Sequence, residues 1–215
     1  MIYLVNYDAG NLLSIKRALI SLKFEFSTIK TITNVNQNDI LLIPGVGSFD
    51  SASKKMMDAG LIDMAKEKPA NRPFIIGICL GMQLLMTYGL EGKLSKGLNL
   101  IKGSVESILS KKPKDLDMPK TLIGWEKFKT KNLGKHFQWL EKYQKNSFYH
   151  VHSYMCIPEK SENIIATYDD DLYFIPNIIG DLDNKALGLQ FHPEKSGEAG
   201  LSLLKDIINC ISKVN

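Results

Sequence analysis

The sequence predicts an α/β protein with an open, mostly parallel β-sheet flanked by helices. Three observations predict it: short runs that are apolar throughout, amphipathic stretches between them, and glycine or proline close behind several of the apolar runs. Strands without polar alternation are typical of parallel sheets whose two faces are covered by helices. Since no linker or internal repeat divides the 215 residues, we expect a single domain over residues 1–215.

The first half of the chain alternates strand-like and helix-like segments. Residues 2–7 are mostly apolar, and residues 11–23 carry apolar side chains at the spacing of one helix face. The same alternation then occurs twice more. It predicts strands at 40–43 and 74–78 and helices at 51–66 and 80–88.

The second half of the chain is less regular. Residues 111–119 are rich in lysine and proline and predict a surface loop. The remaining apolar runs predict strands at 147–154, 163–168 and 186–191 and a closing helix at 200–212. In open α/β sheets, reactive groups gather at the carboxyl ends of strands. We therefore expect the chemistry just after residues 43, 78 and 191.

Charge and cysteine content exclude several classes of protein. The net charge is only +4, and the lysines are not interleaved with aromatic residues, so we expect no nucleic-acid partner. The three cysteines are odd in number and widely spaced, which predicts neither disulfides nor a zinc site. No apolar run is long enough to span a bilayer, and no basic leader precedes the first strand. We expect a cytoplasmic protein with no metal, cofactor or membrane partner.

A candidate nucleophile follows the strand predicted at 74–78. Cys79 has Gly77 and Gly81 two residues away on either side, which is the pattern of a nucleophile elbow with cysteine in place of serine. A tight turn from strand to helix leaves no room for side chains at those two positions, and the helix start favours the thiolate. The alternative is a small buried cysteine. Cys156 and Cys210 lack this setting and are expected to be packing residues.

A cysteine nucleophile needs a base, and the base needs an orienting group. Of the four histidines, His192 has a carboxylate nearby, in His192-Pro193-Glu194. Pro193 favours an extended backbone at His192, and side chains two apart on an extended segment point the same way. Glu194 can then hold one ring nitrogen while the other faces Cys79. The alternative is an incidental polar turn.

Acyl transfer also requires backbone donors for the developing oxyanion. The strand predicted at 40–43 ends in Pro44-Gly45-Val46-Gly47, where glycine allows peptide N–H groups to turn toward a ligand. We expect Gly45, Val46 and the Leu80 N–H to form the oxyanion hole. A plain turn is the alternative.

With these residues assembled, the chain resembles the class I (triad-type) glutamine amidotransferases, and among them most closely the glutaminase subunits of imidazole glycerol phosphate synthase. The resemblance covers nearly the whole chain. Its motifs are Tyr7-Asp8-Ala9-Gly10-Asn11-Leu12, Pro44-Gly45-Val46-Gly47, Gly77-Ile78-Cys79-Leu80-Gly81-Met82-Gln83, Val151-His152-Ser153-Tyr154 and Gln190-Phe191-His192-Pro193-Glu194-Lys195-Ser196.

The resemblance implies a flavodoxin-like core and hydrolysis of glutamine by Cys79, His192 and Glu194. It also implies that Gln83 and Glu91 hold the glutamine, although both would otherwise read as ordinary polar residues on a helix face. The expected partner is the cyclase subunit, a (β/α)₈ barrel that receives the ammonia, or a related barrel synthase. By the same resemblance Asn11, Tyr149 and Lys195 lie on the face of this heterodimer, with a solvated lysine as the alternative for Lys195.

One segment departs from the family pattern. The family usually reads Pro-His-x-Gly-Trp-Asn, whereas residues 119–126 read Pro-Lys-Thr-Leu-Ile-Gly-Trp-Glu. The departure leaves open a second acceptor, because paralogous subunits supply ammonia for amidination of surface-glycan sugars. From other classes, a non-catalytic regulatory subunit and a stand-alone hydrolase of γ-glutamyl compounds are the alternatives, both disfavoured by the motifs.

Overall fold

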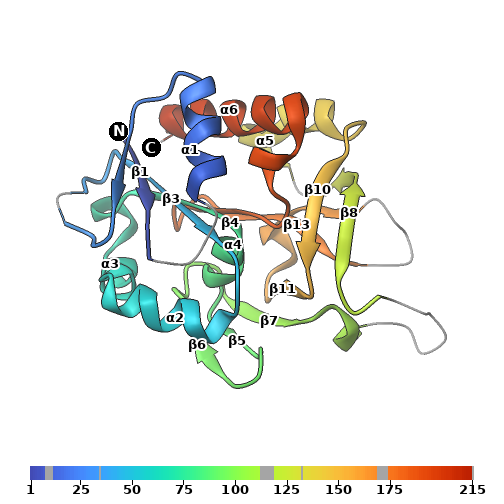
Figure 1. The fold of residues 1–215 in the computed structure, drawn as a ribbon, viewed down its shortest axis with the longest axis horizontal. Coiled ribbons are helices and arrows are strands. Elements are labelled where there is room, and N and C mark those ends of the chain that lie inside the picture. The colour runs from blue at the N-terminus through green and yellow to red at the C-terminus, as the bar shows by residue number, and fades with distance from the viewer. Residues whose placement is uncertain (8–11, 34, 112–118, 132, 169–173, 215) are drawn as a thin grey trace.

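A computed structural model describes residues 1–7, 12–33, 35–111, 119–131, 133–168 and 174–214. Its centre is an eight-stranded sheet in the order β2-β1-β3-β4-β14-β13-β12-β9 (Figure 1). The parallel part of the sheet comprises β1 (Ile2–Val5), β2 (Phe26–Ile29), β3 (Ile40–Gly45), β4 (Phe74–Cys79) and β14 (Ala186–Leu189). The predicted α/β class with a mostly parallel sheet is confirmed.

The other three strands extend the sheet in antiparallel fashion. They are β13 (Pro176–Asp181), β12 (Ile164–Tyr168) and β9 (Phe128–Thr130). All six residues of β3 and all six of β4 are buried, which is why these strands read as uninterrupted apolar runs.

Helices cover both faces of the sheet (Figure 1). The hydrophobic core therefore consists of two layers, one between each face of the sheet and the helices that cover it. On one face lie α1 (Leu12–Ser21), α5 (Gly134–Phe137) and α6 (Gly197–Val214). On the other lie α2 (Phe49–Asp58), α3 (Leu61–Lys66) and α4 (Leu80–Leu84). Short 3₁₀ turns complete the fold: η1 (Pro69–Asn71), η2 (Ile108–Lys111), η3 (Gln138–Tyr143), η4 (Ser161–Asn163) and η5 (Pro193–Lys195).

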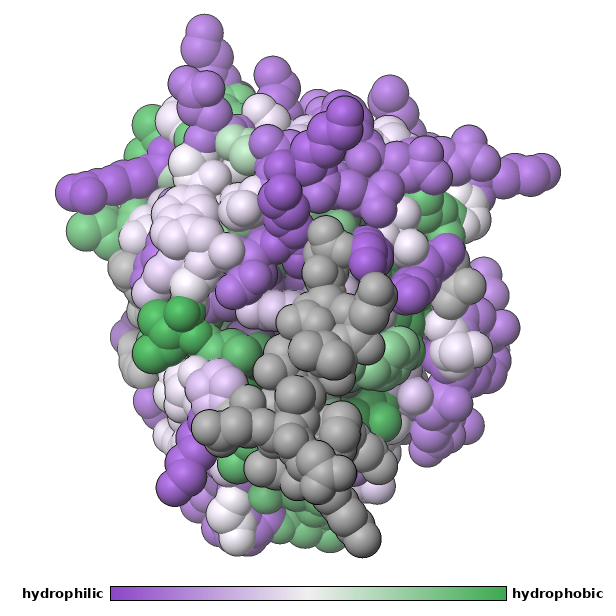
Figure 2. Space-filling model, turned by 90° about the vertical axis from the view of Figure 1, so that its right-hand side faces the viewer, coloured by the Kyte–Doolittle hydropathy of each residue, from purple (hydrophilic) through white to green (hydrophobic). Residues whose placement is uncertain are grey.

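Two smaller sheets lie beside the central one. A two-stranded sheet pairs β10 (Phe148–His152) with β8 (Leu122–Glu126). A four-stranded sheet contains β11 (Tyr154–Pro158), β7 (Gly103–Ser107), β5 (Tyr88–Gly89) and β6 (Ser95–Lys96). The side of the molecule that includes β8 and β10 has a hydrophilic upper part and separate small apolar patches below it (Figure 2).

Three predicted elements were wrong in extent. The helix at 51–66 is broken into α2 and α3 at Gly60, whose φ of 79° lies in the left-handed region. The helix at 80–88 ends at Leu84, because the carbonyls of Leu84, Leu85 and Met86 accept hydrogen bonds from residues 98–101 instead. The strand at 147–154 is two strands, β10 and β11, which belong to different sheets. Most of the loop predicted at 111–119 lies outside the described residues.

In the part of the chain that the structure describes, none of the helices combines the length and the apolar character needed to cross a bilayer.

Candidate active site

Three neighbouring strands bring the candidate residues to one edge of the sheet. Strands β3, β4 and β14 are adjacent, with Gly45 opposite Cys79 and Ile78 opposite Leu189 in register. Their carboxyl ends therefore meet at a single place. The glycine-rich turn, Cys79 and His192, which the sequence places just after these strands, therefore lie at the same edge of the sheet.

Cys79 occupies a sharp turn between β4 and α4. Its φ of 56° and ψ of −111° are a conformation that side chains seldom adopt outside functional turns. A Cβ at Gly77 would overlap the Gly81 carbonyl, and a Cβ at Gly81 would overlap the Ile43 carbonyl oxygen. Both glycines are therefore required by close approach of the backbone, as expected for a nucleophile elbow.

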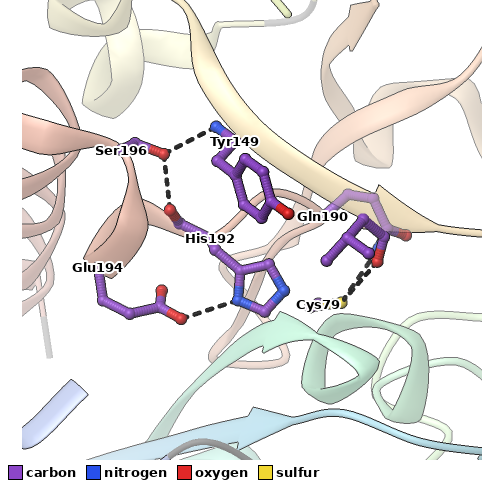
Figure 3. Close-up of polar contacts among 7 residues, drawn as sticks. Cys79, Tyr149, Gln190, His192, Glu194 and Ser196 are labelled. Atoms are coloured by element: carbon purple, nitrogen blue, oxygen red, sulfur yellow. Dashed lines mark hydrogen bonds and ion pairs between the residues drawn. The ribbon is translucent and has the colours of Figure 1, made fainter. Parts of the chain in front are cut away.

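The Cys79 thiol is almost fully enclosed, with 6% of the residue exposed. Its Sγ lies 3.9 Å from the Val151 carbonyl oxygen and 3.9 Å from Nε2 of Gln190. Figure 3 shows Glu194, the His192 ring and Cys79 in a row, with Gln190 on the far side of the sulfur. The sulfur is thus held in a polar setting on one side and faces the imidazole on the other.

His192 and Glu194 form a buried pair. Nδ1 of His192 lies 2.8 Å from Oε1 of Glu194, and each side chain is 3% exposed. His192 itself is extended, but Glu194 reaches the ring through the 3₁₀ turn η5 that starts at Pro193. The predicted pairing is therefore present, while the extended backbone expected through Glu194 is not. Ser196 fixes the turn by donating to the His192 carbonyl at 2.6 Å.

The surroundings of His192 favour its protonated form. Burial by itself favours the neutral ring, but the Cys79 thiolate and the Glu194 carboxylate outweigh it and raise the pKa of His192 from 6.5 to about 10. Nε2, the ring nitrogen that does not contact Glu194, is buried and has no hydrogen-bond partner among the described residues. That nitrogen is thus available to exchange a proton with Cys79 or with a leaving group.

This raised pKa predicts how stability depends on pH. The His192 imidazolium contributes to the free energy of unfolding fully below about pH 6.5, and the contribution is lost as pH rises through about 10. Urea unfolding of the wild type should therefore show a larger loss of stability between these two pH values than unfolding of His192→Gln. Equal losses in the two proteins would contradict the assigned charge state.

The residues expected at the oxyanion hole lie close to Cys79. Gly45 is opposite Cys79 in the sheet, and Val46 and Leu80 line the same cavity as Cys79. Gly45 is buried at the end of β3, Val46 is 42% exposed, and Leu80 is the first residue of α4. The Tyr7 hydroxyl donates to the Pro44 carbonyl at 2.9 Å and so anchors this turn. Burial, followed by the nearby Cys79, raises the pKa of Tyr7, which keeps its hydroxyl a donor.

A cavity of about 320 Å³ opens beside Cys79. Its lining includes Gln83 and Glu91, the two residues expected to hold the substrate. The Gln83 amide donates to the Tyr154 carbonyl at 3.2 Å, and the Glu91 carboxylate accepts the Phe49 N–H at 2.7 Å. The other side chains that line the cavity are Val46, Leu80, Thr121, Val151, His152, Ser153 and Tyr154.

Two of the residues expected at a partner face, Tyr149 and Lys195, lie against each other. The Lys195 ammonium is 5.9 Å from the centre of the Tyr149 ring, and that ring packs at 6.0 Å against Trp125. Trp125 is 55% exposed. Asn11, the third predicted interface residue, lies outside the described residues.

The remaining histidines and cysteines lie in other settings. Burial is the main cause that lowers the pKa of His152 to about 4, so this ring is neutral at the edge of the cavity. His136 is exposed, on α5. Cys156 is fully buried and Cys210 partly buried against the core, in agreement with the packing role expected of them.

Two residues in the cluster were not singled out from the sequence. Gln190 lies against Cys79, and Ser196 connects the His192 carbonyl to the Tyr149 N–H. Both belong to the motif around His192, and their spacing of two residues before and four after it is a signal that could have marked them. Their partners Cys79 and Tyr149 come from distant segments, and the sequence does not reveal these contacts.

Comparison with known proteins identifies the family of the chain. The model of the family "Glutamine amidotransferase class-I" matches residues 3–210. The chain is 34% identical to imidazole glycerol phosphate synthase subunit HisH of Methanopyrus kandleri, across 98% of each chain. It is 36% identical to the subunit of the same name from Listeria monocytogenes, covering 95% of this chain and 93% of that one.

Solved structures agree in fold. PurLQS from Thermotoga maritima superposes with a TM-score of 0.67 and 19% identity, over 97% of each chain. A crystal structure of a glutamine amidotransferase superposes with a TM-score of 0.65 and 17% identity, over 98% of this chain and 99% of that one. Together with the family match, which spans nearly the whole sequence, they lead to one conclusion: the chain belongs to the class-I glutamine amidotransferases.

Proposed function

We propose that this single-domain chain hydrolyses glutamine to glutamate and ammonia through a Cys79-His192-Glu194 triad. The observation that carries the proposal is the buried His192–Glu194 pair, 2.8 Å apart, beside a cysteine at a strained strand-to-helix turn. Cys79 attacks the side-chain carboxamide carbon, and His192 passes a proton to the departing ammonia. Water then attacks the thioester, His192 accepts its proton, and glutamate leaves with Cys79 restored.

The surrounding residues have supporting roles in this proposal. Backbone N–H groups around Gly45, Val46 and Leu80 stabilise the negative oxygen of the tetrahedral intermediate. Gln83 and Glu91 line the cavity and bind the glutamine head group, the Glu91 carboxylate pairing with its ammonium. Because Glu91 also accepts the Phe49 N–H, its position is tied to the start of α2.

The ammonia acceptor is proposed from the relatives. Subunits named HisH belong, by that name, to imidazole glycerol phosphate synthase. We propose that this chain is the corresponding subunit in histidine biosynthesis, in the cytoplasm, and forms a heterodimer with a (β/α)₈ cyclase subunit. Exposed apolar Ile123 and Trp125, next to Tyr149 and Lys195, support an interface on this side; Asn11 is proposed to join them.

The proposal predicts that the isolated chain releases glutamate slowly and that the partner with its acceptor stimulates the release strongly. The physical reason is that the loop after Gly45 directs its donors correctly only in the complex. Glutamate release should be measured with the chain alone, with the cyclase subunit, and with both subunits and acceptor. Equal rates in all three mixtures would contradict the coupling, whereas labelling of Cys79 by a diazo-ketone glutamine analogue would still report the nucleophile.

A second acceptor is favoured by one observation, the unusual sequence of residues 119–126, part of which forms β8 at the proposed interface. In this alternative the ammonia amidinates a surface-glycan sugar. Expression in a histidine auxotroph that lacks its own glutaminase subunit separates the two. Growth supports the histidine role, and failure to grow despite measurable glutaminase activity supports the paralogous role.

A further inference from the structure

A glutamine side chain connects the nucleophile to the residue expected to hold the substrate. Gln190, directly after β14, is fully buried, and its backbone N–H donates to the Asn177 carbonyl at 2.9 Å. Its side chain lies between Cys79 and Gln83, with Nε2 3.9 Å from Sγ and Oε1 3.2 Å from Nε2 of Gln83. Figure 3 shows Gln190 on the side of Cys79 away from the imidazole.

The orientation of the Gln190 amide follows from its partners. The Tyr154 carbonyl is only an acceptor, so the group of Gln83 that lies 3.2 Å from it is the NH₂. The same NH₂ contacts Gln190, which must therefore present its oxygen to Gln83. The Gln190 NH₂ is then left facing the sulfur. The hydrogen-bond network of Tyr154, Gln83 and Gln190 thus assigns the oxygen and nitrogen of both amides.

The two neighbours of the sulfur favour opposite protonation states. The Val151 carbonyl can only accept, so it pairs with the S–H of the neutral thiol. The Gln190 amide can only donate at this position, so it stabilises the negative thiolate. Both lie 3.9 Å from Sγ. Removing Gln190 would therefore take away one of the groups that favour the thiolate and leave only the His192 imidazolium to oppose the Val151 carbonyl.

We propose that Gln190 is a positioning residue that stabilises the Cys79 thiolate and joins it to Gln83. This inference rests on the proposed function, because it assigns Gln190 a part in activating the same nucleophile. A change in Gln83 when substrate binds is transmitted through one amide to the sulfur. The competing interpretation is that Gln190 only satisfies the buried Gln83 amide and fills space.

The test is the rate at which iodoacetamide alkylates Cys79, followed by mass spectrometry of the peptide that contains it. The variant is Gln190→Met, which keeps the approximate volume and removes the donor; Gln190→Leu, which also removes the donor and adds no charge, is the second variant. The matched control is Asn177→Val, which changes a fully buried polar side chain nearby that has no hydrogen bond to the sulfur. Thermal unfolding selects the variants that fold.

We expect Gln190→Met to be alkylated about tenfold more slowly than wild type near neutral pH, because one hydrogen bond to the thiolate is lost. The two rates should converge at high pH, where every thiol is ionised. Asn177→Val should follow the wild-type profile. Overlapping profiles for wild type and every folded Gln190 variant would overturn the proposal, since a purely structural role does not alter the pH dependence.

The same samples separate this inference from the proposed function. Alkylation reports the state of the sulfur without requiring turnover. If wild type is alkylated but releases no glutamate with partner and acceptor, the proposed function fails. If wild type turns over and the Gln190 variants keep its pH profile, the proposed function stands and the role of Gln190 fails.

Discussion

Replacing Cys79 with alanine is expected to lower glutamine turnover by at least about 10⁴-fold while leaving the fold intact, because nucleophile and base act as one unit in such triads. The substitution removes a single sulfur atom at the edge of the core, and the fold should not depend on its two polar contacts, both at 3.9 Å. The backbone turn at this residue is held by neighbouring segments, so alanine should adopt it. Glutamate release in the presence of the partner and far-ultraviolet circular dichroism would measure the two effects.

Cys210→Ala is the matched control for that experiment. Cys210 is partly buried, and its Sγ contacts the His136 carbonyl at 3.3 Å, on the helical layer rather than at the sheet edge. Turnover should therefore remain close to that of the wild type. If Cys79→Ala retained turnover, the nucleophile would have to be another group. If it failed to fold, Cys79 would be a structural residue.

Gly81→Ala is expected to destabilise the protein by more than about 4 kcal/mol, a size reserved for severe steric or packing faults. The added methyl group would overlap the Ile43 carbonyl oxygen, which belongs to the fully buried strand β3. Neither backbone can withdraw, because β3 is paired on both sides within the sheet. Chemical unfolding, or loss of soluble protein when the destabilisation exceeds the total stability, would measure the effect.

The comparison variant is Gly92→Ala. Gly92 has a φ of 72° and no atom within 4 Å of the position that a Cβ would take. Alanine there should cost only about 1–2 kcal/mol from the left-handed backbone. The difference between the two variants isolates the overlap with β3 from ordinary glycine effects. Similar stabilities for both would show that the elbow can relax, against the expectation for a rigid strand-to-helix turn.

The parallel half of the sheet could be predicted because its strands are buried on both faces and therefore read as apolar runs. The antiparallel half was largely missed. Strands such as β9 and β13 were not expected: β9 has only three residues, and β13 starts with proline and includes polar residues. The helix from residue 80 was predicted too long because the apolar periodicity of the sequence continues past Leu84. In the structure the carbonyls of residues 84–86 instead accept hydrogen bonds from the N–H groups of residues 98–101.

The candidate site shows a similar division. Cys79, His192 and Glu194 could be found because local constraints accompany them, namely two glycines at fixed spacing and an acid two residues from a histidine. Gln190 could not be assigned a contact, since its neighbours Cys79 and Gln83 lie more than a hundred positions away in sequence. Such contacts depend on which strands pair and in what register, and neither can be read from the sequence. A short turn, rather than an extended strand, also proved to join His192 to Glu194.

The tie between Tyr149 and the turn after His192 has a mechanical consequence. The Tyr149 carbonyl accepts the His192 N–H at 2.9 Å, and the Tyr149 N–H donates to Ser196 at 2.9 Å. If a protein bound to Tyr149 and displaced β10, His192 would have to move with the strand, or the two hydrogen bonds would have to break. Each hydrogen bond contributes roughly 1 kcal/mol. Where the two hydrogen bonds hold, a displacement of Tyr149 would be passed on to His192.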